Sequence, residues 1–257
     1  MTLTKNEILD LNYPDFVAFL EQENTPPGAD YTLNYWLREG QVNSRSHVFD
    51  LACTTGFSLR RASQLTSCSG FGLDISKTAA DQANAFAQKE KLNSIGFVHG
   101  DATDIPFKDK LFTHVFGGSN FSFIQERKKG LEEVARVLKP AGFLCISNYF
   151  YNKPPTATTL DAVEQSIGFR PSAEWTEQYW NDFLSTHFAL FKSDQIQLPQ
   201  NTDEEIQESI QSQLNSNSKK LGPAELKVCA DRLFEIRKVL NEHRRYQTIA
   251  LQIWIKK

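Results

Sequence analysis

Residues 47–56 read HVFDLACTTG, an apolar run followed by a loop of small residues. The run HVFDL is short and is bounded by a turn, so we expect a buried β-strand over 47–51. Gly56 closes the loop at a point where glycine takes left-handed backbone without a Cβ penalty, and a helix is predicted over 58–65. A strand, a tight loop and a helix in this order begin a βαβ unit, which predicts a parallel sheet.

The same alternation continues toward the C-terminus. Short β-rich runs predict further strands, at 70–73, 95–98, 111–116, 142–147, 187–198 and 248–255. Helical patterns lie between them, at 77–92, 126–138, 158–167, 173–184 and 225–243. We therefore predict an α/β fold, a Rossmann-like doubly wound and mostly parallel seven-stranded sheet.

Further helical segments are predicted at the start of the chain and before its last strand. We expect residues 1–45 to form an N-terminal helical cap, with helices near 13–21 and 31–37, and residues 46–257 to form the main domain. Within that domain, 199–247 is predicted to be a helical insert or lid. The last strand is predicted to be of the edge type, because apolar and other residues alternate along it, at Ile249, Leu251, Ile253 and Ile255.

Composition and charge exclude several classes of protein. The net charge is −3, and no basic stripe runs along the chain, which argues against a nucleic-acid partner. The apolar stretch from Ile249 to Ile255 is too short for a membrane span, and the first ten residues lack the apolar core of a secretion signal. The four cysteines are widely spaced, so we expect neither a disulfide framework nor a metal site, and a cytoplasmic location.

Acidic residues follow three successive predicted strands. Ligands of an open parallel sheet bind beyond the carboxyl ends of its strands. Asp50 lies at the end of the first strand, Asp74 follows the second, and Asp101 with Ala102 follows the third. One carboxylate can accept from both ribose hydroxyls and another from an exocyclic amine such as that of adenine. These strand ends therefore predict a nucleoside site.

Several motifs in this order resemble those of class I S-adenosylmethionine-dependent methyltransferases. The loop at 50–56 resembles the D-x-G-x-G-x-G motif of the family, with Ala52 and Thr54 in place of two glycines. The acidic residue after the second strand matches Asp74. Gly100-Asp101-Ala102 and the run VARVLKPAG at 134–142 match two further motifs. The resemblance covers residues 48–147 and implies S-adenosylmethionine as the cofactor.

The resemblance also implies roles for individual residues. The backbone of the first loop would face the amino acid moiety of the cofactor, Asp74 its ribose and Asp101 its adenine. Ser119, at the end of the fourth strand, would lie beside the sulfonium. The cofactor-binding residues that it implies are Asp50, Ala52, Cys53, Thr54, Gly56, Asp74, Ile75, Asp101, Ala102, Gly117 and Ser119.

The acceptor is expected to be a small molecule that is methylated on oxygen or nitrogen by in-line displacement. Asn120, Tyr149 and His187 are candidates for orienting it or for transferring a proton, because their side chains carry suitable donors and acceptors. His243 is a further candidate, whereas the Arg244-Arg245 pair is predicted to lie on a solvated helix face. Two alternatives stay open, a non-catalytic module that binds the cofactor and a NAD-type dehydrogenase, although the G-x-G-x-x-G loop of the latter is missing.

Overall fold

The computed structural model describes residues 3–23, 25–216 and 221–257. The strands are β1 (His47–Leu51), β2 (Ser69–Asp74), β3 (Ile95–His99), β4 (Phe112–Gly117), β5 (Leu138–Tyr151), β6 (Phe188–Ile196) and β7 (Gln247–Lys256). They form one seven-stranded sheet in the order β3-β2-β1-β4-β5-β7-β6. Strands β1 to β5 are parallel to one another, and β7 runs antiparallel to both β5 and β6. The predicted fold class is confirmed.

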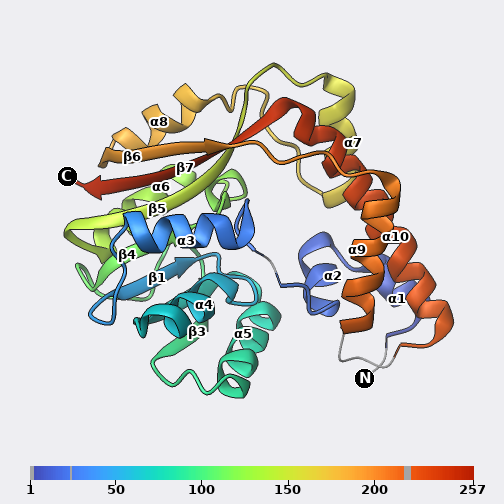
Figure 1. Ribbon diagram of the computed structural model, residues 1–257, viewed down its shortest axis with the longest axis horizontal. Coiled ribbons are helices and arrows are strands. Elements are labelled where there is room, and N and C mark those ends of the chain that lie inside the picture. Colours follow the sequence, from blue (N-terminus) through green and yellow to red (C-terminus); the bar gives the residue numbers. More distant parts are fainter. Residues whose placement is uncertain (1–2, 24, 217–220) are drawn as a thin grey trace.

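Helices cover both faces of this sheet (Figure 1). The helices are α1 (Lys5–Asp10), α2 (Tyr13–Phe19), α3 (Ala29–Glu39), α4 (Phe57–Thr66), α5 (Lys77–Lys89), α6 (Arg127–Val137), α7 (Ala157–Ile167), α8 (Glu177–Ser185), α9 (Asp203–Ser216) and α10 (Pro223–His243), with short 3₁₀ turns η1 (Asn120–Ser122) and η2 (Arg244–Tyr246). Helices α3, α4 and α5 pack on one face, with Val48 of β1 in the same cluster. Helices α6 and α8 pack on the other, with Phe49 of the same strand. Successive residues of β1 thus enter opposite cores, as a central strand requires.

A group of helices lies beyond one end of the sheet (Figure 1). Helix α10 contacts α1, α7 and α9 there. Their apolar faces share a cluster that includes Phe16 and Phe19 from α2, Ile206 and Ile210 from α9, and Leu233 from α10. Because α9 and α10 follow β6 and precede β7 in the chain, the helical insert before the last strand is present.

Three details differ from the sequence predictions. Helix α1 was not predicted, and a capping box at Thr4 and Glu7 begins it. Strand β5 is longer than the predicted 142–147. The last strand is not an edge strand, because β7 lies between β5 and β6 and its residues 249–254 are buried. Ala250 and Trp254, which alternate with Ile249, Leu251 and Ile253, are themselves apolar and are buried on the opposite face of the sheet. Both faces of this strand are therefore covered.

Arg232 of α10 connects the first helix to the rest of the molecule. Its guanidinium donates to the carbonyl oxygens of Ile8, at 2.6 Å, and Leu11, at 2.5 Å. It also lies 4.1 Å from the ring centroid of Phe16. The carbonyl groups at a helix C-terminus lack intrahelical partners and carry partial negative charge, so this cation stabilises the end of α1.

We expect the substitution Arg232→Gln to loosen the N-terminal helices without unfolding the sheet. The free energy of local opening over residues 3–20 should fall by about 1.5–3 kcal/mol, the usual value for hydrogen bonds to a charged group. Amide hydrogen exchange measures this quantity. Lys227→Gln is the control, since Lys227 is exposed and pairs with Asp231, at 2.8 Å. Equal exchange in the two variants would contradict the assignment.

Candidate functional site

The three predicted carboxylates lie at the same edge of the sheet. Asp50 of β1 is in register with Gly72 of β2, and Asp74 at the end of β2 is in register with His99 of β3. Asp101 follows two residues after His99. The amide of Gly100 donates to the carbonyl oxygen of Asp74 at 2.9 Å, which fixes the two strand ends side by side.

The loop between β1 and α4 takes left-handed backbone at three positions. Gly56 has φ of 77°, and a Cβ atom there would lie 2.5 Å from the ring of Phe97, so only glycine fits. Ala52 has φ of 47° and Thr54 has φ of 46°, values that side chains rarely adopt. The two residues that replace glycines of the motif therefore keep a glycine-like conformation.

Asp74 holds this loop in place. One carboxylate oxygen of Asp74 accepts the amide of Thr54 at 2.8 Å, and the other accepts the amide of Ser76 at 2.8 Å. Ser76 in turn caps α5, as its side chain accepts from the amide of Ala79. One buried side chain thus joins the end of β2, the first loop and the start of a helix.

The carboxylates differ in their electrostatic surroundings. The pKa of Asp50 is raised to about 7, mainly by burial. The hydrogen bond from the amide of Leu59 lowers this pKa, and the charge of Asp74 raises it. Burial also raises the pKa of Asp74, although the amides of Ser76 and Thr54 oppose the shift. The pKa of the exposed Asp101 is lowered by hydrogen bonds from the backbone and side chain of Thr103. A cation placed near Asp50 would therefore stabilise a costly buried charge.

The end of β4 lies beside the same loop. Asn120 donates its side-chain amide to the carbonyl oxygen of Leu51, and its own Oδ1 is buried with no partner among the described residues. Ser119 is buried and takes left-handed backbone, with φ of 62°. Gly117 precedes it at the end of the strand. At Gly118, a Cβ atom would lie 3.0 Å from Pro26, so the segment before α3 packs over this strand end.

The remaining predicted residues of this edge differ in exposure. Ile75 is 71% exposed, so its apolar side chain is available to a ligand. Ala102 and Cys53 are buried. Burial raises the pKa of the Cys53 thiol well above its usual value, and the charges of Asp50 and Asp74 raise it further. Cys53 is therefore not a thiolate nucleophile.

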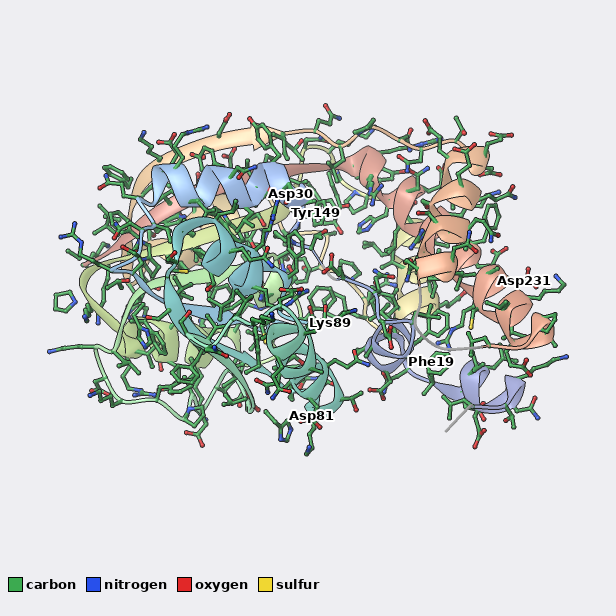
Figure 2. All side chains as sticks on the ribbon, turned by 60° about the horizontal axis from the view of Figure 1, so that its bottom comes forward. Phe19, Asp30, Asp81, Lys89, Tyr149 and Asp231 are labelled. Carbon is green, nitrogen blue, oxygen red and sulfur yellow. The ribbon has the colours of Figure 1, made fainter. Side chains whose placement is uncertain are left out.

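A cavity of about 660 Å³ adjoins this edge and lies between the sheet and the helices of the insert. Gly118 and Ser119 line it from the end of β4, and Tyr149 and Tyr151 line it from β5. Residues of α2, α7, α9 and α10 form its other walls. Figure 2 shows Tyr149 on the side of the sheet that faces α10, whereas Asp231 points away from it.

The structure separates the predicted acceptor residues. Asn120 and Tyr149 lie at the carboxyl ends of β4 and β5. His187 precedes β6, whose first residue, Phe188, pairs with Lys256 at the opposite end of the sheet. His187 therefore does not lie with them, because β6 starts where β7 ends.

His243 and Arg244 behave differently from the sequence predictions. His243 is buried and lines the cavity, where its Nε2 lies 2.8 Å from the hydroxyl of Tyr151. Burial lowers the pKa of His243 to about 4, so it is neutral at pH 7. Arg244 lines the cavity as well, while Arg245 is exposed and pairs with Glu242 at 3.1 Å. The sequence feature that could have placed Arg244 in the cavity is its spacing of four residues from Leu240, which lies on the apolar face of α10.

The described residues, 3–23, 25–216 and 221–257, contain no group of three or more His, Cys, Asp or Glu side chains placed to hold a metal ion. They also contain no helix with the length and apolar character that crossing a membrane requires.

The chain is similar to proteins of known family. A family described as a methyltransferase domain matches residues 49–146. The crystal structure of the MccD protein is 40% identical, with a TM-score of 0.80, over 91% of this chain and 100% of that one. The phosphoethanolamine N-methyltransferase 2 of Haemonchus contortus, solved with S-adenosyl-L-methionine, has a TM-score of 0.72 at 15% identity, over 99% of this chain and 60% of that one.

Curated relatives match over shorter regions. The demethylmenaquinone methyltransferase of Oceanobacillus iheyensis is 30% identical over 113 residues, which are 43% of this chain and 48% of that protein. The chain thus spans about half the length of the curated relatives it matches.

The strained loop yields a stability prediction. The substitution Ala52→Gly should raise the free energy of unfolding by about 0.5–1 kcal/mol, because left-handed backbone costs a residue with a Cβ roughly 1–2 kcal/mol and glycine loses part of that gain through entropy. Ala85→Gly, at an exposed helical position of α5, should lower it by about 1 kcal/mol. Urea denaturation of both variants measures the difference. A loss of stability in both would show that the loop is unstrained.

Proposed function

Because the chain belongs to the class I S-adenosylmethionine-dependent methyltransferase family, we propose that it transfers the methyl group of this cofactor to an oxygen or nitrogen of a small molecule. The observation that carries the proposal is the position of the cavity. It begins at Gly118 and Ser119, where β4 ends, directly beside the end of β1 that carries Asp50, and Asp74 ends the next strand, β2. An acceptor in the cavity would thus meet the cofactor at the end of β4.

The residues present fit the cofactor. Asp50 is a buried carboxylate without a cationic partner among the described residues, and Asn120 offers a buried, unpartnered Oδ1 nearby. These are acceptors for the ammonium of the amino acid moiety. We assign Asp74 to the ribose, Asp101 and Ala102 to the adenine, and exposed Ile75 to its apolar face. The remaining contacts would come from the backbone of Ala52, Cys53, Thr54, Gly56, Gly117 and Ser119.

The protein mainly has to position the acceptor and exclude water. When bound, S-adenosylmethionine supplies a methyl group on a sulfonium, which is already a good leaving group. Tyr149 and Ser119 line the cavity and orient the acceptor by hydrogen bonds. Asn120 holds the end of β4 against the first loop, so that the two parts of the site stay aligned. His243 is neutral, and its Nε2 lies 2.8 Å from the hydroxyl of Tyr151; in the tautomer that leaves Nε2 unprotonated, it would receive a proton from an incoming hydroxyl or ammonium group through that hydroxyl.

The helical segments support a small acceptor. Residues from 1–45 and from the insert at 199–247 supply much of the wall of the cavity, including Tyr13, Pro26, Ile236 and Leu240. We propose that these segments act as a cap and a lid over the acceptor. A cavity of about 660 Å³ lies within the range of sites for small molecules.

The cellular compartment and the alternative functions are also matters of proposal. A reducing compartment such as the cytoplasm is supported by the four cysteines, which are all free and buried. The non-catalytic alternative is favoured by Ala52 and Thr54 in place of glycines, but the left-handed conformation of both residues weakens it. The dehydrogenase alternative has no supporting observation.

The substitution Asp74→Ala tests the cofactor site. Affinity for S-adenosylhomocysteine should fall by ~1–3 kcal/mol, because the loop and the ribose both lose a charged acceptor. Asp81→Ala is the control, as Asp81 lies exposed on the outside of α5 and pairs with Lys77 (Figure 2). Titration calorimetry measures both. Unchanged affinity in Asp74→Ala would reject the assignment.

Turnover needs its own measurement. Wild-type protein should move label from the methyl group of S-adenosylmethionine to a product from a panel of small alcohols, phenols and amines, with release of S-adenosylhomocysteine. Cofactor binding without any labelled product would favour the non-catalytic module. Release of methylthioadenosine instead would mean that the acceptor attacks a different carbon of the sulfonium.

The pKa of Asp50 predicts how cofactor binding depends on pH. With a pKa of about 7 in the free protein, Asp50 is protonated below pH 6, and an ammonium favours its ionised form. Affinity for S-adenosylhomocysteine should therefore rise between pH 5.5 and 8, by up to about tenfold per unit below pH 7. Methylthioadenosine lacks the ammonium and should show a flatter profile, as should the variant Asp50→Asn. Parallel profiles for the two ligands would place the ammonium elsewhere.

A further inference from the structure

Two arginines line the cavity on one face of α10 and the turn that follows it. Arg237 and Arg244 are seven residues apart, two turns of helix and about 10 Å along its axis. Both belong to the lining of the cavity, which contains no aspartate or glutamate among the described residues. This part of the cavity therefore carries positive charge without a countercharge.

Neither arginine has a carboxylate partner in the described parts of the chain. The guanidinium of Arg237 donates to the hydroxyl of Ser209 at 2.7 Å and to the side-chain oxygen of Gln213. Arg244 donates to the hydroxyl of Tyr149. By contrast, Arg60, Arg136 and Arg170 each form ion pairs with carboxylates.

The two cations also act on one another. Burial lowers the pKa of Arg237, and the charge of Arg244 lowers it further, whereas Tyr13 opposes the shift. A partly buried cation without a counterion is unfavourable, and a second one nearby adds to the cost. An anion bound between them would remove both penalties.

Two phenols complete this end of the cavity. Tyr13 of α2 and Tyr149 of β5 both line it, and each lies close enough to Arg237 or Arg244 to sense its charge. Burial raises the pKa of both hydroxyls, so they stay protonated at pH 7 and can donate to an anion.

We propose that Arg237 and Arg244, with the hydroxyls of Tyr13 and Tyr149, bind an oxyanion carried by the acceptor, a phosphate or a carboxylate. This inference rests on the proposed function and names the substrate class of the same site. Arginine suits such a group because its planar fork of donors matches the oxygens of phosphate and carboxylate.

A further part of the cavity lining is apolar and aromatic. It includes Phe123, Phe169 and Trp175, whose rings pack in sequence at centroid distances of 4.7 Å and 5.8 Å. Val163 and Ile167 of α7 lie in the same lining. The acceptor should therefore be amphipathic, with an apolar body against these rings and an anionic group on the arginines.

Three probes that share one ring system test this inference in the full-length protein. We would titrate 1-naphthyl phosphate, 1-naphthoate and 1-naphthol into the protein saturated with S-adenosylhomocysteine. At least one of the two anions should bind ~10-fold or more tightly than the neutral naphthol. The two anionic arms distinguish a phosphate site from a carboxylate site. Equal affinity for all three probes, or no binding of either anion, would overturn the proposal.

Variants assign the effect to the arginines. Arg237→Gln and Arg244→Gln should each weaken binding of the preferred anion by ~10- to 100-fold and leave binding of naphthol unchanged. Arg245→Gln is the matched control, since Arg245 is exposed and pairs with Glu242 instead of lining the cavity. Arg244→Lys should restore part of the affinity, because it keeps the charge. Equal losses in Arg245→Gln, or none in the first two, would contradict the assignment.

Affinity for S-adenosylhomocysteine separates this inference from the proposed function. All the arginine variants should bind it as the wild type does, which also shows that they are folded. If the wild type bound the anionic probe but not S-adenosylhomocysteine, the proposed function would fail while the anion site stood. If it bound S-adenosylhomocysteine but no anion, the anion site would fail while the proposed function stood.

Discussion

The site depends on one buried carboxylate. Asp74 accepts the amide of Thr54 with one oxygen and that of Ser76 with the other, and so joins the end of β2 to the loop after β1 and to the start of α5. A buried carboxylate without such donors would be costly. The loop in turn keeps Ala52 and Thr54 in left-handed backbone, and the amide of Thr54 donates to Asp74. Protein stability and the ligand site therefore rely on the same hydrogen bonds.

Much of the sheet and of its carboxyl edge was predictable from local patterns. The run HVFDL and the acidic residues after each strand are local features, and parallel strands place their carboxyl ends at one edge, so Asp50, Asp74 and Asp101 were expected together. Strand order at the other edge depends on long-range pairing. The alternation in the last strand thus indicated an edge position, although β7 lies inside the sheet with β6 outside it.

The acceptor side was less predictable, because it is built from segments far apart in the sequence. Adjacent residues Arg244 and Arg245 have the same chemistry, yet only the first lines the cavity. The spacing of four residues between Leu240 and Arg244 is a local signal, but it does not show that this face of α10 lines a cavity. His187 was chosen for its region alone, and the antiparallel pairing of β6 with β7 places it at the far end of the sheet.

A crystal structure with S-adenosylhomocysteine bound tests the account most directly. We expect the ribose within hydrogen-bond distance of Asp74, the adenine beside Asp101 and Ala102, the ammonium near Asp50, and the sulfur facing the cavity past Ser119. A ligand whose sulfur points away from that cavity, or whose ribose does not contact Asp74, would contradict the account.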